Sequence, residues 1–589
     1  MKSATALAVT LLGFHLADAS PRNRTSVASH KGLTKEKPAV ACQGTDFRPL
    51  SAGQWIDAAS PGWNAGNTLD ATPTEGSWNN PPLQGSTLDY VKAAGYKSVR
   101  IPVTYVEHFV GGSPDWKINA TWLQRVSDVV DMATSRGLFV ITNIHHDSSN
   151  WADVTKPGAN QTQIQEKFYA AWLQIGKTLA CKPASVALEP INEAPGNTDQ
   201  DADNLNKMNA LFLKALADSG GYNAQRVVTL SGPGMGADKT HWFKRPANMT
   251  NPWAFQFHFY SPYDFVFGAW GKTVWGSDSD KAAVLAEISS VRNNFTDVPI
   301  LLGEFDASQL NAEPAARWKW FDYVVRTCKS LGITTVLWDN GLDNLDRQTG
   351  QWRDKIAVDI TMAVLRGENN SLADCTTDPS ATTQQSSAYI FNKVGSSVTD
   401  QTLPFLLNGN KFKSFSVGST VLNEGQDYTI SGSAVTFKKS FLSTYLSPTA
   451  EPGTKANVTV AFSSGAPSQV EIVQWDVPTL RSYTSAAKAV PSGDLQIPIV
   501  WKGLHRVAAV KITTSAGAYL VDDWTQWLPD LQKGRGTFNS QWNYDQDRII
   551  ITRGGLDAVA SSGKTTTFMF EFYPRAAGNG NTLNYTLTV

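Results

Sequence analysis

Short apolar runs that end in polar residues recur between residues 61 and 341. Each run is followed by a stretch with helical spacing of its apolar positions. Apolar runs of this length that alternate with helices are typical of a parallel sheet buried on both faces. Eight such units predict an α/β fold, a (β/α)8 barrel, rather than an open sheet. The runs occupy residues 61–70, 96–105, 137–147, 185–193, 225–234, 253–262, 298–307 and 333–341.

Polar side chains are concentrated at the ends of these runs. In (β/α)8 barrels the active site lies at the C-terminal ends of the strands, so residues from all eight ends are expected to meet. An open sheet would instead place its ligand at one switch point. The residues collected in this way are Asn64, Asn67, Arg100, His145, His146, Asn192, Glu193, His258, Tyr260, Glu304 and Trp338.

Two glutamates, Glu193 and Glu304, end the fourth and seventh runs. Hydrolysis of a glycosidic bond requires two carboxyl groups, one that protonates the leaving oxygen and one that acts as nucleophile or activates water. Two such groups in one pocket change each other's proton affinity, and the one in the less polar setting is expected to serve as the acid.

A third glutamate, Glu189, precedes Glu193 in the segment LEPINEAPG, residues 188–196. Side chains alternate along a strand, so both glutamates share one face, separated by about 13 Å along the strand. Pro195 ends the strand, which places Glu193 at the rim. Glu189 is expected to lie deeper, in a structural role, and to need a buried partner, for which Arg100 is one candidate.

After Cys375 the composition changes and the helical periodicity disappears. Residues 375–388 form a Ser/Thr-rich linker, and residues 389–478 show short strands broken by turns, which predicts a β-sandwich. A second linker leads to another β-rich segment, residues 493–589. With the barrel assigned to residues 45–375, the sequence predicts a barrel followed by two β-sandwich modules. The last module holds Trp501, Trp524, Trp527 and Trp542.

The first 19 residues have the features of a secretory signal: Lys2, an apolar run and the cleavage pattern Ala17-Asp18-Ala19. The run is too short to span a bilayer. We therefore expect a secreted, extracellular protein, in which Asn-x-Ser/Thr triplets are candidates for glycosylation. Besides Asn23, these are Asn119, Asn160, Asn248, Asn294, Asn369, Asn457 and Asn584.

Charge and cysteine content exclude some classes of partner. The net charge is -1 and only 17% of residues are charged, which gives no field for nucleic acid or an anionic membrane. Four cysteines allow three pairings, of which Cys42 with Cys375 is favoured because the two residues bracket one domain. No cysteine has metal-ligand spacing. A metal site at residues 145–147 is also disfavoured, because neighbouring residues on a strand point to opposite faces.

The motifs GWNAGNTLD, RIPVTY, NIHHD, NE, HFY, GEF and LWDNG occur in this order over residues 55–365. Together they resemble glycoside hydrolase family 5, the retaining cellulase family, and its endoglucanase–xyloglucanase branch most of all. Ala65 stands where many relatives carry Leu. The resemblance implies a secreted endo-β-1,4-glucanase that acts on cellulose-type β-glucans, needs no cofactor or metal, and is a monomer.

The resemblance also implies a role for each matching residue. Glu193 would be the acid/base, and Glu304 the nucleophile, kept ionised by Arg100. Asn192 would bond the sugar 2-hydroxyl, Trp338 would form the stacking floor, and Asn64 would contact the adjacent sugar. His145, His258 and Tyr260 would line the glycosyl subsite, and His146 would be either a further subsite residue or a packing residue.

Beyond the barrel, the segments LNGNKFKSF and LNEGQDYTISGSAVTF resemble the immunoglobulin-like modules of bacterial cellulases, which would act as spacers. DDWTQWLPD resembles carbohydrate-binding module family 46, so Trp524 or Trp527 is a candidate ligand contact, with one of the two packed inward. Alternatives remain: a xyloglucanase, a mixed-linkage glucanase, a mannanase or exo-glucosidase, or a non-catalytic glucan-binding wall protein.

Overall fold

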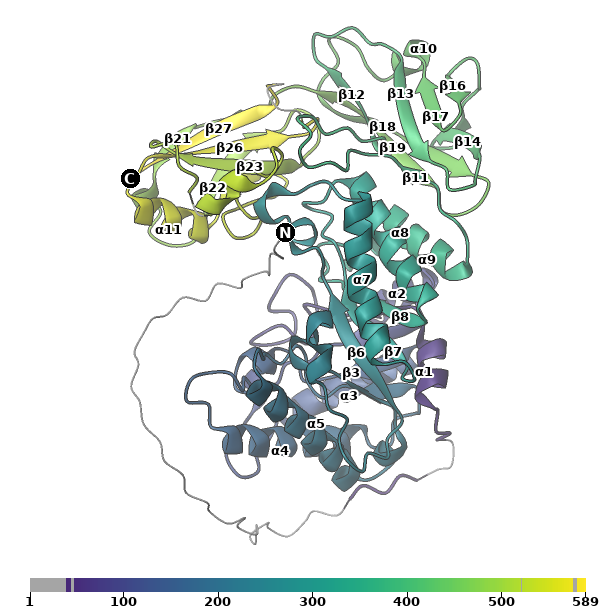
Figure 1. Cartoon of the computed structure of the whole chain (residues 1–589), viewed down its shortest axis with the longest axis vertical. Helices are drawn as coiled ribbons and strands as arrows, with labels where there is room; N and C mark the ends of the chain where they lie inside the picture. The colour runs from purple at the N-terminus through teal and green to yellow at the C-terminus, as the bar shows by residue number, and fades with distance from the viewer. Residues whose placement is uncertain (1–38, 44–46, 521, 576–579) are drawn as a thin grey trace. The chain divides into compact units, whose positions relative to one another are not determined.

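The computed structural model describes residues 39–43, 47–520, 522–575 and 580–589. The predicted signal segment and Asn23 lie outside these residues. Eight parallel strands close into a barrel in the order β1 to β8 (Figure 1). They are β1 (Gly62–Asn64), β2 (Ser98–Ile101), β3 (Phe139–Thr142), β4 (Val186–Leu188), β5 (Val228–Leu230), β6 (Trp253–Phe259), β7 (Ile300–Phe305) and β8 (Ile333–Leu337).

The pairing of the first strand with the last closes the barrel. Gly62 of β1 is paired with Ser98 of β2 on one side and with Val336 of β8 on the other. Each of the eight strands lies within one of the eight apolar runs of the sequence. The prediction of a (β/α)8 barrel is therefore confirmed.

Helices follow seven of the eight strands, and their starts are encoded locally. Thr198 and Ser277 accept hydrogen bonds from the backbone three residues on, where an aspartate returns the bond in a capping box. After β5 the described chain forms 3₁₀ turns, including Ala237–Trp242, instead of an α-helix. The main barrel helices are α2 (Gly85–Ala93), α3 (Ala120–Thr134), α4 (Gln161–Leu179), α5 (Asp199–Ser219), α7 (Asp278–Asn294), α8 (Pro314–Ser330) and α9 (Lys355–Arg366), with a short α6 (Tyr263–Val266).

Helix α1 (Ala52–Ala59) precedes the first strand and covers the end of the barrel from which the strands start. Trp55 and Ile56 of α1 are buried in one cluster with inward-facing strand residues such as Ile141 and Leu301. Ser51 begins the helix with a capping box. The N-terminal end of the barrel is thus filled with apolar side chains, which leaves the opposite end for polar residues.

Two modules, each built from two sheets, follow the barrel. The middle one has the sheets β11-β13-β17-β16 and β12-β19-β18-β14-β15, and the last has β20-β22-β25-β24 and β21-β27-β26-β23. The strands are β11 (Leu372–Ala373), β12 (Tyr389–Lys393), β13 (Gln401–Leu406), β14 (Phe412–Val417), β15 (Thr420–Val421), β16 (Tyr428–Ser431), β17 (Ala434–Phe437), β18 (Gly453–Phe462), β19 (Ser468–Trp475), β20 (Thr479–Leu480), β21 (Thr484–Ala486), β22 (Leu495–Val500), β23 (Val507–Thr514), β24 (Trp542–Tyr544), β25 (Arg548–Ile551), β26 (Thr566–Phe572) and β27 (Thr582–Thr588). Short helices α10 (Lys439–Leu442) and α11 (Arg553–Ser562) belong to the middle and last modules.

The edges of the modules extend beyond the segments expected from composition. β11 pairs with β13, so residues 372–373, placed with the barrel from the sequence, contribute to a sheet of the middle module. β20 and β21 lie in the segment expected to be a linker, yet they pair with β22 and β27 of the last module.

The disulfide prediction is wrong. Cys42 is bonded to Cys181, which follows α4, and Cys375 is free. Val40 pairs with Gly220, so the segment before α1 lies against the ends of α4 and α5, near Cys181. The prediction assumed that the two ends of the barrel domain lie side by side. Instead, Cys375 directly follows the region of β11, which already belongs to a sheet of the middle module.

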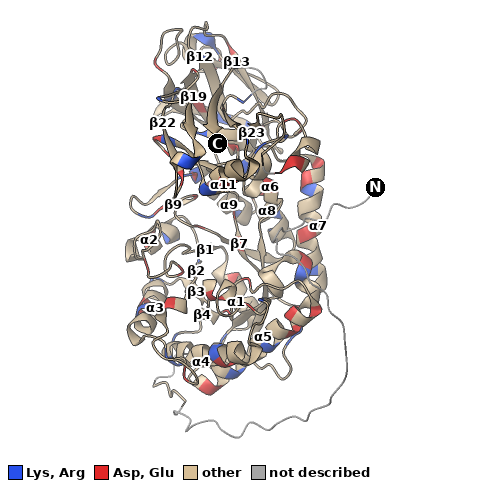
Figure 2. Cartoon of the chain, turned by 90° about the vertical axis from the view of Figure 1, so that its left-hand side faces the viewer, with Lys and Arg blue, Asp and Glu red and all other residues tan. Residues whose placement is uncertain are grey.

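The surface is consistent with the low net charge. In Figure 2 the ribbon positions of basic and acidic residues are intermixed along helices such as α4, α5 and α7. Among the described residues, no helix combines the length and the apolarity needed to cross a membrane. The seven triplets from Asn119 to Asn584 all have exposed asparagines, and their glycosylation stays a prediction.

Candidate active site

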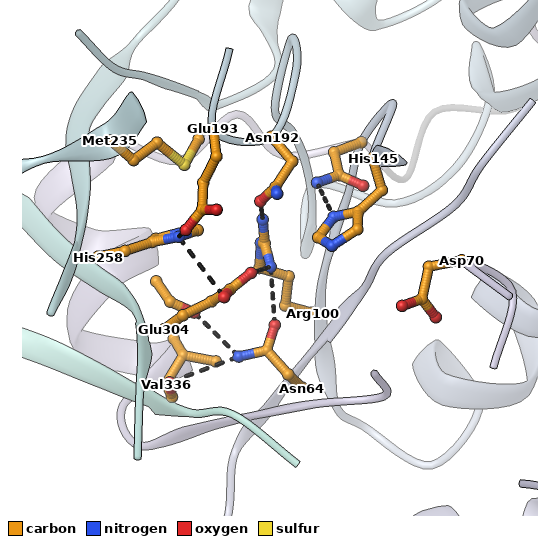
Figure 3. Close-up of polar contacts among 12 residues, drawn as sticks. Asn64, Asp70, Arg100, His145, Asn192, Glu193, Met235, His258, Glu304 and Val336 are labelled. Atoms are coloured by element: carbon orange, nitrogen blue, oxygen red, sulfur yellow. Dashed lines mark hydrogen bonds and ion pairs between the residues drawn. The ribbon is translucent and has the colours of Figure 1, made fainter. Parts of the chain in front are cut away.

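Arg100, at the centre of the barrel, joins the polar residues that the sequence placed at the strand ends (Figure 3). Its side chain is fully buried, and its Nη1 donates to Glu304 Oε1 at 2.6 Å and to Asn64 Oδ1 at 2.9 Å. Its Nε and Nη2 donate to the two oxygens of Glu189, both at 2.7 Å, and Nη2 also donates to Asn192 Oδ1 at 2.8 Å. All five N–H groups of the guanidinium are therefore used.

Glu304 lies at the end of β7 and is held on both oxygens. Arg100 binds Oε1, and the Tyr260 hydroxyl donates to Oε2 at 2.9 Å. His258 Nδ1 is 3.5 Å from Oε2. Burial raises the pKa of Glu304, and the electrostatic interactions with His258 and Arg100 oppose that rise. The carboxyl is thus fixed in orientation by two donors from different strands.

Glu193 follows β4 in a backbone conformation that is rare for a side-chain-bearing residue, with φ of 37°. Its side chain is 41% exposed, against 6% for Glu304. Oε1 is 2.6 Å from His258 Nδ1, and Oε2 has no hydrogen-bond partner among the described residues. Burial raises the pKa of Glu193, but the hydrogen bond and electrostatic interaction with His258, together with the charge of Arg100, lower the pKa below the ordinary value.

The two carboxyl groups lie close together. One oxygen of Glu193, one oxygen of Glu304 and a ring nitrogen of His258 are all within 4.8 Å of one another. Of the two carboxyls, the more buried one, Glu304, has the raised pKa, and Glu193 has the lowered pKa. The roles implied by the resemblance require the opposite order, with the higher pKa on the acid, Glu193, and the lower pKa on the nucleophile, Glu304. The order is reversed here because His258 is hydrogen-bonded to Glu193.

β4 ends at Leu188, before both glutamates, so the predicted strand alternation and the predicted strand end at Pro195 are wrong. Glu189 is nevertheless the deep, structural carboxylate that was expected, and Arg100 is its partner. It is fully buried, one residue beyond the end of β4. Asn143 Nδ2 donates to its Oε1 at 2.8 Å, and Gln256 Nε2 donates to its Oε2 at 2.9 Å. Burial would raise the pKa of Glu189, but Arg100 lowers it below the ordinary value.

His145 and His146 do not point to opposite faces as expected. A 3₁₀ turn begins at His146, and the two rings lie 4.5 Å apart, with Asp70 close to both. Asn143 Nδ2 is 3.1 Å from His145 Nδ1, and its own Oδ1 accepts from the backbone of Val103. Because the Asn143 amide group donates to Nδ1, the neutral ring carries its proton on Nε2, which then acts as a donor rather than a metal ligand.

The geometric reason for disfavouring a metal at these histidines was therefore wrong, and the expectation that no metal binds there stays a prediction. Burial lowers the pKa of His145 well below its ordinary value, and neighbouring His146 and Arg100 act in the same direction, so the ring stays neutral. His146 is 37% exposed and packs beside Trp78, with ring centroids 5.4 Å apart.

Trp338 follows β8 and is half-buried with its ring parallel to His145 at 5.9 Å. A side chain at Gly66 would approach the Trp338 ring to 2.7 Å, so this glycine leaves room for the indole. The exposed part of the ring provides the flat apolar surface on which a sugar ring can stack.

Asn64 is the site residue that the structure reassigns. It is fully buried, its Nδ2 donates to the backbone oxygens of Gly303 and Leu337, and its Oδ1 accepts from Arg100. It cannot contact an adjacent sugar, because β1 turns its side chain into the barrel. Asn64 instead links Arg100 to the strand that carries Glu304.

The expectation that Trp524 or Trp527 packs inward is also wrong, since both are exposed, by 46% and 81%. Trp524 packs edge-on against Trp270 of the barrel with ring centroids 4.8 Å apart. Trp270 Nε1 donates to Asp522 at 2.9 Å. A 3₁₀ turn over Asp523–Trp527 directs both indoles outward.

Sequence reasoning missed Asn143 and Gln256, the two amides that complete the acceptor positions of Glu189. Asn143 directly follows β3 in the motif NIHH, so its position at a strand end was a usable signal. Gln256 lies inside β6, in the alternating run WAFQFHF, where a buried polar residue between phenylalanines was the signal.

The comparisons with known proteins agree with this geometry. Residues 61–344 match the model for cellulase (glycosyl hydrolase family 5), and residues 384–472 match that for carbohydrate binding domain X2. Endoglucanase B of Paenibacillus lautus is 28% identical over 558 residues, which cover 92% of each chain. The match to carbohydrate-binding module family 46 stays a prediction.

Two solved structures extend the comparison. A tri-modular GH5 (subfamily 4) endo-β-1,4-glucanase from Bacillus licheniformis, in complex with cellotetraose, is 32% identical with a TM-score of 0.80, over 92% of this chain and 99% of that one. A family 5 xyloglucanase from Paenibacillus pabuli is 29% identical with a TM-score of 0.50, over 52% of this chain and 99% of that one. The chain belongs to glycoside hydrolase family 5.

Proposed function

We propose that this protein is a secreted, monomeric, retaining endo-β-1,4-glucanase that hydrolyses internal bonds of cellulose-type β-glucans. The observation that carries the proposal is the pair Glu193 and Glu304, whose oxygens approach within 4.8 Å at the C-terminal end of the barrel. Retaining glycosidases hold their carboxyl groups about 5–5.5 Å apart, whereas inverting enzymes leave about 6.5–9.5 Å for a water molecule. The short separation therefore supports a double displacement.

In the first step Glu304 attacks the anomeric carbon and forms a glycosyl-enzyme, while Glu193 gives its proton to the leaving glycosidic oxygen. Arg100 and Tyr260 hold the attacking carboxylate in place. His258 occupies Oε1 of Glu193, which leaves Oε2 to carry the transferred proton. In the second step Glu193 takes a proton from water, whose oxygen attacks the anomeric carbon and releases Glu304.

The remaining residues suit the sugar in the glycosyl subsite. Asn192 Oδ1 is held by Arg100, so its Nδ2 is left for the 2-hydroxyl. His145 offers its Nε2–H to a further hydroxyl, and Trp338 provides the floor. His146 follows His145 in the sequence and lies beside the exposed Trp78, so it suits contact with a neighbouring sugar.

We further propose that the last module binds glucan through Trp524 and Trp527. Both indoles are exposed, and Trp524 lies against Trp270 of the barrel. In the middle module no described aromatic side chain is largely exposed, which supports a spacing role there. Trp524→Ala and Trp527→Ala should reduce activity on long polymers more than on short oligosaccharides, whereas equal losses on both would contradict a binding role.

Assays on a panel of cellulose-type glucan, xyloglucan, mixed-linkage glucan and mannan test the activity. Endo action predicts a rapid fall in viscosity with mixed oligosaccharide products. The xyloglucanase match makes xyloglucan the main rival substrate. Binding to insoluble glucan without release of reducing ends would instead favour a non-catalytic wall protein.

Two variants separate the roles of the catalytic carboxyls. Glu304→Gln should lose nearly all activity on every substrate, because no glycosyl-enzyme forms. Glu193→Ala should retain slow attack on substrates with good leaving groups, and added azide should yield a β-glycosyl azide. Near-wild-type activity of Glu304→Gln would refute the nucleophile assignment.

A further inference from the structure

Glu189 is a buried carboxylate to which the reaction above gives no step, yet its contacts are complete. Oε1 accepts from Arg100 Nη2 and Asn143, and Oε2 accepts from Arg100 Nε and Gln256. A carboxylate has about four acceptor positions, so every one is used. Two of the four bonds form a bidentate pair with one guanidinium, the geometry that fixes an arginine most firmly.

This bidentate pair determines where Arg100 can point. The guanidinium is planar, so fixing Nε and Nη2 against Glu189 also fixes Nη1, which contacts Glu304 at 2.6 Å. Turning Nη1 away from Glu304 would break both bonds to Glu189. The position of the donor to the nucleophile is therefore set from the opposite side of the arginine.

The pair also distributes charge. Arg100 faces two buried carboxylates, so its single positive charge is shared between Glu189 and Glu304. The other groups that face Glu304 are His258 from β6, Tyr260 just after β6 and Glu193 after β4. Without the charge on Glu189, the field of Arg100 on Glu304 would be unopposed from that side.

The opposing charges of Arg100 and Glu189 act on Glu193 as well. His258 is hydrogen-bonded to it, an oxygen of Glu304 lies within 4.8 Å, and the Tyr260 hydroxyl is close enough to interact with its charge. Arg100 favours its charged form, and Glu189 raises its pKa by like-charge repulsion. Glu189 therefore favours the protonated state that Glu193 needs as the acid, from a position below the substrate.

We propose that Glu189 is a positioning residue that fixes Arg100 against Glu304 and offsets the charge that Arg100 presents to both catalytic carboxyls. The inference rests on the proposed glucanase function. A purely structural role predicts a different result. If Glu189 only neutralised a buried arginine, its removal would lower the stability of the fold and leave the pH dependence of the reaction unchanged.

Glu189→Gln tests the charge with nearly the same shape. The amide oxygen can accept from Arg100 Nη2 and Asn143, and the new amide N–H meets Gln256, whose buried Oε1 lacks a partner among the described residues and can turn to accept it. One bond, from Arg100 Nε, is lost. We expect both limbs of the pH profile of kcat/KM on soluble β-glucan to move to lower pH, by about one unit.

Glu313→Gln is the matched control. Glu313 is an equally buried carboxylate, but it accepts from the first turn of α8 and from Ser386, outside the Arg100 network. We expect its pH profile to keep the wild-type limbs, whatever happens to its melting temperature. A shift as large as that of Glu189→Gln would mean that any lost buried carboxylate moves the profile, and would overturn the proposal.

Glu189→Asp keeps the charge but is one methylene too short for the bidentate contact. We expect the two limbs of its pH profile of kcat/KM to stay close to the wild-type positions while kcat falls at least tenfold. This variant decides the question if Glu189→Gln does not fold. Wild-type limbs in folded Glu189→Gln, or wild-type kcat in Glu189→Asp, would overturn the inference. Wild-type protein that releases no reducing ends at any pH would refute the proposed function instead.

Discussion

Gly303 precedes Glu304 on β7, and its missing side chain leaves the space that Gln256 fills. A Cβ at this position would lie 2.5 Å from Gln256 Nε2, 2.8 Å from Cδ and 3.0 Å from Cγ. To reach 3.4 Å, where ordinary contact begins, the amide must move by about 0.9 Å. That movement would disturb its hydrogen bond to Glu189, which holds Arg100.

Gly303→Ala should therefore destabilise the barrel by about 1–3 kcal/mol, the usual cost of overpacking a core. The backbone of Gly303 is not in the left-handed region, so the effect is steric. Its carbonyl oxygen also accepts from Asn64, and any shift of β7 should lower kcat/KM as well. Unfolding followed by tryptophan emission reports on the barrel, which holds 15 of the 20 tryptophans.

A double-mutant cycle isolates the clash. Gln256→Ala removes all three atoms that the new Cβ would meet, so it should cost less in the Gly303→Ala background than in the wild type, with a coupling of about 0.5–3 kcal/mol. Gly53→Ala is the control, because nothing lies within 4 Å of a Cβ built there. Additive effects in the cycle, or wild-type stability and kcat/KM for Gly303→Ala, would refute the reasoning.

Three further outcomes follow from single contacts. Cys42→Ser opens a loop with a sequence separation of 139 and should cost up to about 5 kcal/mol, seen as a lower melting temperature that reductant reproduces in the wild type but no longer changes in the variant. His258→Ala removes the hydrogen bond that lowers the pKa of Glu193, so the high-pH limb of its residual activity should move upward; an unmoved limb would contradict this. Burial raises the pKa of Asp306 to about 8, so the fold loses stability from this group as pH rises from about 4 to 8. The melting temperature of Asp306→Asn, relative to that of the wild type, should therefore rise as pH increases over that range. A difference in melting temperature that does not change with pH would speak against the raised pKa of Asp306.

The eight barrel strands could be predicted because their signal is local. A strand buried on both faces is apolar along its length, and the polar residues at its end mark the edge at which it leaves the core. The same rule placed Glu193 and Glu304 at the same end of the barrel, where their oxygens lie within 4.8 Å of one another. Glu189 was correctly expected to lie deeper than Glu193, with Arg100 as a candidate partner, although the strand alternation used to argue this does not apply because β4 ends at Leu188.

Other features depended on contacts that no local pattern contains. Asn64 lies at a strand end like the other residues collected from the sequence, but its amide is bonded to Gly303, Leu337 and Arg100. His145 and His146 share a side because the strand has already turned into a 3₁₀ helix. Side-chain alternation holds only while the strand continues, and the sequence does not mark the residue at which it stops.

The sequence by itself determined the barrel, the number of modules behind it, and which carboxyl groups lie at the C-terminal end of the barrel, since apolar periodicity and strand polarity fix these over a few residues. Only the tertiary structure decided the partner of Cys42, the outward direction of Trp524 and Trp527, and the bonds that surround Glu189. Those depend on segments far apart in the chain, such as Arg100 and Glu304, whose approach is set by closure of the barrel. The residue types determine which contacts are chemically possible. The folded backbone determines which of them form, because it sets the distance and direction between the groups.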